Sequence, residues 1–129
     1  MALETEALVL PRERVLRGVQ RVFSDPGRGR YYVAQQNSQV LACLLITFEW
    51  SDWRDAWYWW IQSVYVAPHA RRVGVFRTLY EYIQIRARET GKACGLRLYV
   101  ERGNSRAQST YSQLGMHETH YCLYEESFE

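Results

Sequence analysis

The turn between residues 66 and 75 constrains the fold more than any other part of the chain, because it joins a β-strand to an amphipathic helix. The β-rich run 57–66 ends at Val66, and Pro68 follows in a basic turn that contains Gly74. Apolar side chains then recur at intervals of three, four and seven residues, which predicts a helix that ends near Thr90-Gly91. The apolar positions of this helix are Phe76, Leu79, Tyr80, Ile83 and Ala87.

The start of this helix is a candidate anion site. The first N–H groups of a helix have no intrahelical acceptor, and the aligned peptide dipoles place partial positive charge there, so a phosphate binds readily. Two arginines add formal charge at the same place, and Gly74 has no Cβ to hold a ligand away from the main chain. A solvated basic turn is the alternative, and the coincidence of glycine and helix start favours phosphate contact. The predicted contact residues are Arg71, Arg72, Val73, Gly74, Val75 and Phe76.

The remaining periodicities predict a mixed, mostly antiparallel sheet flanked by helices, in the α/β class and of the α+β type. Apolar spacing of about 3.6 residues predicts helices, whereas alternation predicts strands. The order α-β-β-β-α-β-α-β places one right-handed β-α-β crossover after an antiparallel meander, so the strands ending at Val66 and Val100 should be parallel neighbours. The expected elements are a helix over 11–23, a hairpin of Tyr31–Ala34 and Val40–Trp50, a strand over Trp57–Val66, a helix over 76–90, a strand over Leu96–Val100, a helix over Ala107–Leu114 and a last strand over Thr119–Glu125.

Composition excludes several classes of function. A chain of 129 residues is expected to form one domain, and no run approaches the roughly 20 apolar residues that a membrane helix needs. A net charge of +2 with dispersed arginines does not indicate nucleic-acid binding. The start of the chain lacks a signal-peptide pattern, and three cysteines without C-x-x-C spacing favour reduced thiols, so we expect a cytoplasmic location. No metal site is predicted.

A second segment carries a family resemblance. Asn104, Ala107, Tyr111, Gly115 and Met116 fit the pattern Asn-x-x-Ala-x-x-x-Tyr-x-x-x-Gly-(Phe/Met). This is similar to one of the two signatures of the GNAT acyl-CoA N-acyltransferase superfamily. The other signature, (Q/R)-x-x-G-x-(G/A), resembles the turn described above.

The match to that turn signature is incomplete. Arg71 and Gly74 fit two of its three defined positions, whereas Phe76 replaces a small residue. The resemblance covers roughly residues 11–125. The family normally has a further strand and helix before the position of Pro11, and we expect this chain to be N-terminally shortened there.

The resemblance implies a binding mode for acetyl-CoA as acyl donor. In the family the two parallel strands splay apart, and the pantetheine arm of the cofactor pairs with free backbone groups of the first strand. This role falls on residues 64–66 (Val64, Tyr65 and Val66), with Asn104 and Ala107 as further contacts. Asn104 fits equally well as a helix N-cap.

The resemblance also implies that Tyr111 is the catalytic acid that protonates the departing thiolate. The alternative for Tyr111 is a packed aromatic residue. The general base stays open. The segment 48–66 looks most like the diamine acetyltransferase branch, which usually has an acidic pair where this chain has Gln62 and Ser63. Glu49, Glu101, His69 or a water chain are the substitutes considered.

Aromatic side chains concentrate around residues 50–60. Alternation places Trp57 and Trp59 on one sheet face and Tyr58 and Trp60 on the other. The set outside the core suits either a cationic amine or a dimer interface, and we favour the interface. A homodimer is therefore expected, through the aromatic strand surface or through an exposed sheet edge. The predicted substrate-binding residues are Glu49, Trp50, Trp53 and Gln62.

The functional hypothesis is an N-acetyltransferase that moves acetyl from acetyl-CoA to a primary amine of a small molecule by direct attack. The alternative is a catalytically impaired acyl-CoA-binding or assembly module. The missing carboxylate at Gln62 and the expected N-terminal shortening motivate the alternative.

Overall fold

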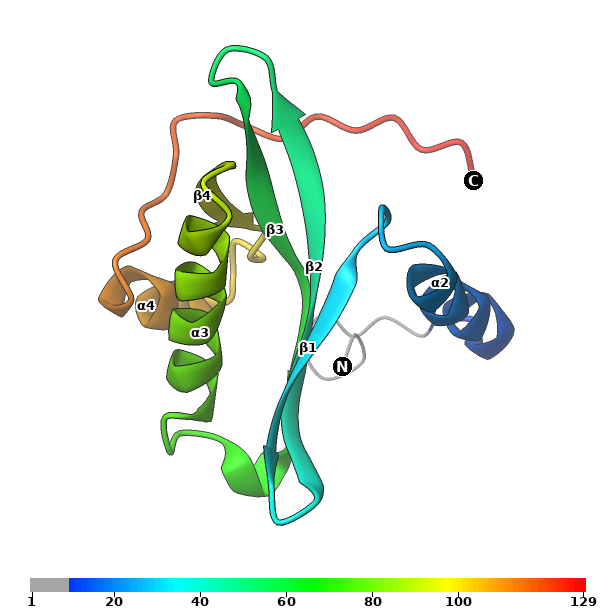
Figure 1. Cartoon of the computed structure of the whole chain (residues 1–129), viewed down its shortest axis with the longest axis vertical. Helices are drawn as coiled ribbons and strands as arrows, with labels where there is room; N and C mark the ends of the chain where they lie inside the picture. Colours follow the sequence, from blue (N-terminus) through cyan, green and yellow to red (C-terminus); the bar gives the residue numbers. More distant parts are fainter. Residues whose placement is uncertain (1–9) are drawn as a thin grey trace.

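The computed structural model describes residues 10–129. Four strands form one sheet in the order β1-β2-β3-β4, and Figure 1 shows helices on both of its faces. The elements are α2 (Arg12–Ser24), β1 (Arg30–Gln36), β2 (Gln39–Ser51), β3 (Ala56–Val66), the short 3-10 turn η1 (Pro68–Ala70), α3 (Val75–Glu89), β4 (Ala93–Leu98) and α4 (Ser105–Gln113). The predicted mixed fold is confirmed.

Local sequence explains the two antiparallel connections and the crossover. Asn37 and Ser38 both have positive φ, as the two-residue β1–β2 hairpin requires, and Asn adopts that conformation readily. β2 pairs antiparallel with β3. α3 then returns the chain so that β4 pairs parallel with β3, as the β-α-β order predicts.

The core lies between α3 and one face of the sheet. Leu44, Ile46 and Ile83 are the largest side chains with almost no exposure. Alternation along β3 places Trp59 in this core, with 7% of its surface exposed, and turns Trp60 to the opposite face. The core face is therefore the one that carries Trp59 and Ile61.

The opposite face of the sheet is only partly covered. α2 lies on this side in Figure 1, away from α3 and α4. Its contact with the sheet includes a stacked pair of rings, Phe23 and Tyr31, with centroids 5.4 Å apart. No residue of α2 is buried, so this helix covers the sheet loosely. The face around Trp60 stays accessible beside it.

The predicted last strand, Thr119–Glu125, is wrong. Residues 117–129 form neither helix nor strand. A strand needs an edge to pair with, and this segment leaves the sheet: Glu129 at its end forms an ion pair with Arg14 of α2 at 3.1 Å. β4 also ends at Leu98, two residues before the expected Val100.

Three further expectations concern the termini, the thiols and the membrane. The strand and helix expected to be missing before Pro11 concern residues that lie outside the described range. Cys43, Cys94 and Cys122 are free thiols, as predicted. Among residues 10–129, the helices are too short or too polar to cross a bilayer.

Candidate active site

The pairing of the two parallel strands ends before β3 does, so the last backbone groups of β3 have no partner in β4. The β3–β4 pairing ends at Ile61 and Leu98, whereas β3 continues to Val66. The Ala67 N–H donates to the Leu41 carbonyl of β2 at 2.8 Å. Because the direction of backbone groups alternates along an antiparallel strand, those of Val64 and Val66 point away from β2, toward the side that β4 has left. Residues 64 and 66 can therefore pair with amide groups of a ligand, as the resemblance implied, whereas Tyr65 directs its groups to β2.

A β-bulge lies where the strands separate. Ser63 pairs with Leu45 and Ile61 pairs with Ile46, so Gln62 is the extra residue of β3. The Thr47 hydroxyl donates to Gln62 Oε1 at 2.8 Å and fixes the side chain on the face opposite α3. Bulges are common beside active sites because they redirect a side chain.

The turn before α3 presents unpaired N–H groups. Arg72 and Gly74 both have positive φ, at 64° and 86°, and Gly74 is the N-cap of α3. Within residues 10–129, no side chain caps this helix start. A Cβ on Gly74 would meet no atom within 4 Å in the free protein. The position therefore favours glycine because of its left-handed backbone conformation and not because space is short. Val73 is exposed and Val75 is half-buried, and the helix dipole makes the main chain of this turn a candidate anion site beside the strand gap.

Arg71 lies in the strand gap and not along the helix. Its Nε donates to the Val66 carbonyl at 2.9 Å, and its guanidinium lies 5.9 Å from the centroid of the Tyr65 ring. Arg72 is exposed. The two arginines predicted to contact phosphate therefore differ in position, since Arg71 holds its charge at the end of β3.

Phe76 packs against α4 and does not obstruct the helix start. Its ring lies 6.0 Å from the ring of Tyr111 in edge geometry and 6.3 Å from that of Tyr80. The phenylalanine that replaces the family's small residue therefore packs against aromatic rings and leaves the helix start open. This contact couples the start of α3 to Tyr111.

The second motif builds the helix that carries Tyr111. Asn104 Oδ1 accepts from the Ala107 N–H at 3.2 Å and caps the N-terminus of α4. Gly115 has a φ of 99°, and the Met116 N–H donates to the Tyr111 carbonyl at 3.0 Å, which ends the helix. Burial raises the pKa of Tyr111 above the ordinary 10. Its phenol is therefore protonated at neutral pH, as a catalytic acid requires.

A polar and aromatic cluster lies on the sheet face opposite α3. Glu49 Oε1 accepts from Trp60 Nε1 at 2.7 Å and from Arg97 Nη1 at 3.1 Å. The Arg97 guanidinium lies 3.5 Å above the centroid of Tyr58, and the rings of Trp60 and Tyr99 are 4.6 Å apart. The second oxygen of Glu49 accepts no hydrogen bond from the described residues, so it is available to a ligand.

The structure brings together only part of the predicted substrate site. Glu49 and Gln62 share the open face, since Thr47 bonds Gln62 and lies two residues from Glu49 on β2. Trp50 pairs with Trp57 on the core face, and Trp53 is 91% exposed at the β2–β3 turn. These tryptophans therefore do not share a pocket with Glu49.

Two residues of the cluster escaped the sequence-based reasoning. Arg97 and Tyr99 alternate with apolar residues, which places both on one face of the predicted strand. The expected parallel pairing of this strand with the strand that contains Trp60 would have placed both residues near Glu49.

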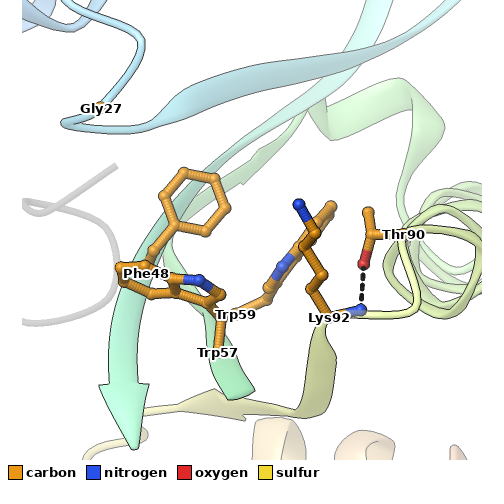
Figure 2. A pocket seen from close by; sticks show the side chains of 6 residues that line it. All are labelled: Gly27, Phe48, Trp57, Trp59, Thr90 and Lys92. Atoms are coloured by element: carbon orange, nitrogen blue, oxygen red, sulfur yellow. Dashed lines mark hydrogen bonds between the residues drawn. The ribbon is translucent and has the colours of Figure 1, made fainter. Parts of the chain in front are cut away.

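The core-face aromatics form a separate shallow pocket. Figure 2 shows Phe48, Trp57 and Trp59 around a cavity of about 320 Å³, with Lys92 on its other side. The Lys92 N–H donates to the Thr90 hydroxyl at 3.1 Å. Trp57 and Trp59 lie near the start of β3, whereas the strand gap lies at its end, so this pocket is distinct from the anion site.

Known proteins share this fold. The family model described as "Acetyltransferase (GNAT) family" matches residues 2–116. A "possible acetyltransferase" from Clostridium difficile 630 is 39% identical, with a TM-score of 0.92 over 99% of this chain and 84% of that one. Among curated proteins no relative matches.

More distant structures share the fold. A probable acetyltransferase is 21% identical, with a TM-score of 0.83 over 98% of this chain and 85% of that one. The aminoglycoside N-acetyltransferase AAC(6')-Iy, in complex with CoA, is 14% identical, with a TM-score of 0.76 over 92% of this chain and 78% of that one. The family model spans most of the sequence, and the chain belongs to the GNAT family of acetyltransferases.

Proposed function

We propose that this protein transfers acetyl from acetyl-CoA to a primary amine of a small molecule by direct attack. One observation carries the proposal: the backbone groups of Val64 and Val66 that face away from β2 lie directly before the N-terminus of α3, which no side chain of residues 10–129 caps. A donor with amide groups in its arm and phosphates at its end fits both features. The family is acyl-CoA-dependent, which supports the same donor.

The donor would lie with its pyrophosphate at residues 73–76 and its pantetheine arm along β3. Arg72 contributes charge at the turn, and Arg71 must exchange its bond to the Val66 carbonyl for ligand contacts if the arm pairs there. The thioester carbonyl would then lie near the bulge at Gln62, where strand N–H groups polarise it. Asn104 and Ala107 support this arrangement through the cap of α4.

The acceptor amine would approach from the open sheet face. Glu49 offers a carboxylate oxygen, while Trp60 and Tyr99 offer aromatic faces that attract a cation. The amine nitrogen attacks the thioester carbonyl, the C–S bond breaks, and Tyr111 donates its phenolic proton to the thiolate. The bound ammonium must lose one proton to water before it attacks, because Gln62 cannot accept that proton. The second proton that leaves the nitrogen after the attack returns through water to the Tyr111 phenolate.

The missing carboxylate at the bulge gives a prediction. We expect Gln62→Glu to raise kcat about tenfold at pH 7, because a general base there would deprotonate an acceptor amine of pKa near ~10. The Thr47 hydroxyl can keep its bond to the new carboxylate. Steady-state kinetics measure the effect, with Gln36→Glu at the exposed end of β1 as control. An unchanged or lower kcat contradicts the placement of the amine beside Gln62.

The acceptor site gives a second prediction. We expect Glu49→Gln to raise KM for the amine about tenfold, equivalent to ~1.4 kcal/mol, because a charge-assisted hydrogen bond is lost. KM for acetyl-CoA should stay within twofold. Glu81→Gln is the matched control, since it removes an exposed ion pair with Arg77 on α3. Equal effects of the two variants on the amine KM would contradict the role of Glu49.

The proposed activity is tested by thiol release with acetyl-CoA and a panel of amines. The panel comprises polyamines, as the resemblance to diamine acetyltransferases suggests, together with amino acids and aminosugars, since one structural neighbour is an aminoglycoside N-acetyltransferase. Turnover with at least one primary amine is the expected result. Acetyl-CoA binding by calorimetry without any turnover would instead favour an acyl-CoA-binding module.

A further inference from the structure

The aromatic pocket at the C-terminal end of α3 is a candidate ligand site that the proposed acyl transfer does not use. Phe48, Trp57 and Trp59 form its walls, and Thr90 and Lys92 lie on its other side (Figure 2). Its volume of about 320 Å³ is at the lower end of the range for small-molecule sites, which begins near ~300 Å³. At roughly 30 Å³ for each water molecule, the pocket has room for one aromatic ring with a short side chain.

The walls of this pocket are arranged to pack a planar ring. The Phe48 ring makes an angle of 80° with Trp57 and of 83° with Trp59, with centroids 6.5 and 5.5 Å apart. Trp57 keeps 38% of its surface exposed although it lies on the core face. An aromatic ligand can stack on one wall and meet another edge-on, and these are the two favoured geometries of ring pairs. The walls therefore favour an aromatic ring over an aliphatic chain.

The indole nitrogens of the pocket are hydrogen-bond donors without an acceptor. Trp59 is only 7% exposed, yet its N–H donates to no acceptor of residues 10–129, and neither does that of Trp57. On the opposite face, by contrast, Trp60 donates to Glu49. An indole N–H that is buried normally has a partner. Figure 2 shows the nitrogens of Trp57 and Trp59 facing the pocket, so a ligand there can accept from both.

Lys92 adds a positive charge that no carboxylate of the described residues neutralises. Its ammonium forms no ion pair within residues 10–129, and the residues that line the pocket include no acid. The Thr90 hydroxyl is already engaged, since it donates to the Ala87 carbonyl at 2.7 Å and accepts from the Lys92 backbone N–H at 3.1 Å. Three side-chain donors, one of them charged, therefore border one pocket. A carboxylate is the complementary acceptor.

We propose that this pocket binds an aromatic carboxylate, with its ring among Phe48, Trp57 and Trp59 and its carboxylate on Lys92 and the two indole N–H groups. Three aromatic walls alone would also suit a cation, but the Lys92 ammonium would repel one. The site is independent of the proposed acyl transfer. It lies at the start of β3, whereas the acyl donor is proposed to lie at the end of that strand.

Quenching of tryptophan fluorescence by 3-phenylpropanoate measures the affinity. We expect saturation with a Kd of about 0.1 mM, which is reasonable for a ligand of this size. Lys92→Met keeps the aliphatic stem but removes the charge and should raise Kd about tenfold or more, whereas Lys92→Arg should stay within about threefold. The neutral 3-phenylpropanamide should bind about tenfold more weakly than the acid. Arg17→Met removes the same charge from an exposed position of α2 and should leave Kd unchanged. Equal binding of acid and amide, or no effect of Lys92→Met, would overturn the proposal.

The indole N–H signals of the five tryptophans locate the ligand in a ¹⁵N-correlated NMR spectrum. On addition of 3-phenylpropanoate the signals of Trp57 and Trp59 should shift, and those of Trp53 and Trp60 should not. The variants Trp57→Phe and Trp60→Phe assign the signals. Saturating acetyl-CoA should leave the Kd of the probe within about twofold, because the two sites lie at opposite ends of β3.

Three outcomes of these measurements would refute the site. A shift of the Trp60 signal without those of Trp57 and Trp59, or displacement of the probe by acetyl-CoA, would place the probe elsewhere. A change in the signals of Trp57 and Trp59 with protein concentration alone would show that a second copy covers these rings.

Discussion

Titration of the Gly74→Asp variant with acetyl-CoA should show at least a 100-fold loss of affinity. A carboxylate at the N-cap of α3 would lie about 5 Å from a pyrophosphate docked on the helix. At an effective dielectric constant near 20, each pair of unit charges at that distance costs about 3 kcal/mol, which exceeds the ~2.7 kcal/mol of a 100-fold change. The aspartate side chain would also accept hydrogen bonds from the same N–H groups that would otherwise bind the phosphate.

Two further substitutions separate charge from backbone strain. Gly74→Asn has nearly the same shape without the charge, and Asn tolerates positive φ, so we expect a loss of tenfold or less. Gly91→Asp places the same charge on a glycine with a φ of 68° and open space around it, at the other end of α3. Its affinity for acetyl-CoA should match that of the wild type. Equal losses in Gly74→Asp and Gly91→Asp would show that the helix start does not hold the cofactor.

Elements with a strong local period were predictable from the sequence. The apolar stripe from Phe76 to Ala87 predicted α3 correctly, because a helix that packs one face on a core needs apolar residues every three or four positions. The strand over 119–125 was wrong because alternation shows that a segment suits a sheet but not that an edge is within reach. Pairing is a tertiary property, and the described C-terminal segment does not pair with the outer edge of β4.

The turn at the start of α3 and the cap of α4 were predictable for the same reason, whereas the arrangement of side chains around Glu49 was not. Gly74 and the motif around Tyr111 are local features whose conformation follows from neighbouring residues. Trp50 and Glu49 are adjacent in sequence but lie on opposite faces of β2, and the bulge at Gln62 shifts the register of β3. Only the three-dimensional pairing shows that Arg97 reaches Glu49 across the sheet.

The phenol of Tyr111 gives the second large effect. We expect Tyr111→Phe to lower kcat about 100-fold at pH 7 and to change KM for acetyl-CoA by less than threefold, because general acid catalysis contributes 10²-fold or more. The ring contact with Phe76 is kept in the variant, so the fold should be unaffected. Single-turnover kinetics would place the loss in the chemical step.

Tyr80→Phe is the matched control, since Tyr80 is buried, contacts the same Phe76 ring and also has a pKa raised by burial. Its kcat should stay within threefold of the wild type. The direction of the shift at Tyr111 sets the pH dependence: an acid is active only while protonated, so kcat should fall as pH rises through a pKa above 10. Tyr111→Phe should lack that alkaline fall. Similar kcat values for the two variants at pH 7 would mean that Tyr111 only packs against α3 and that water protonates the thiolate.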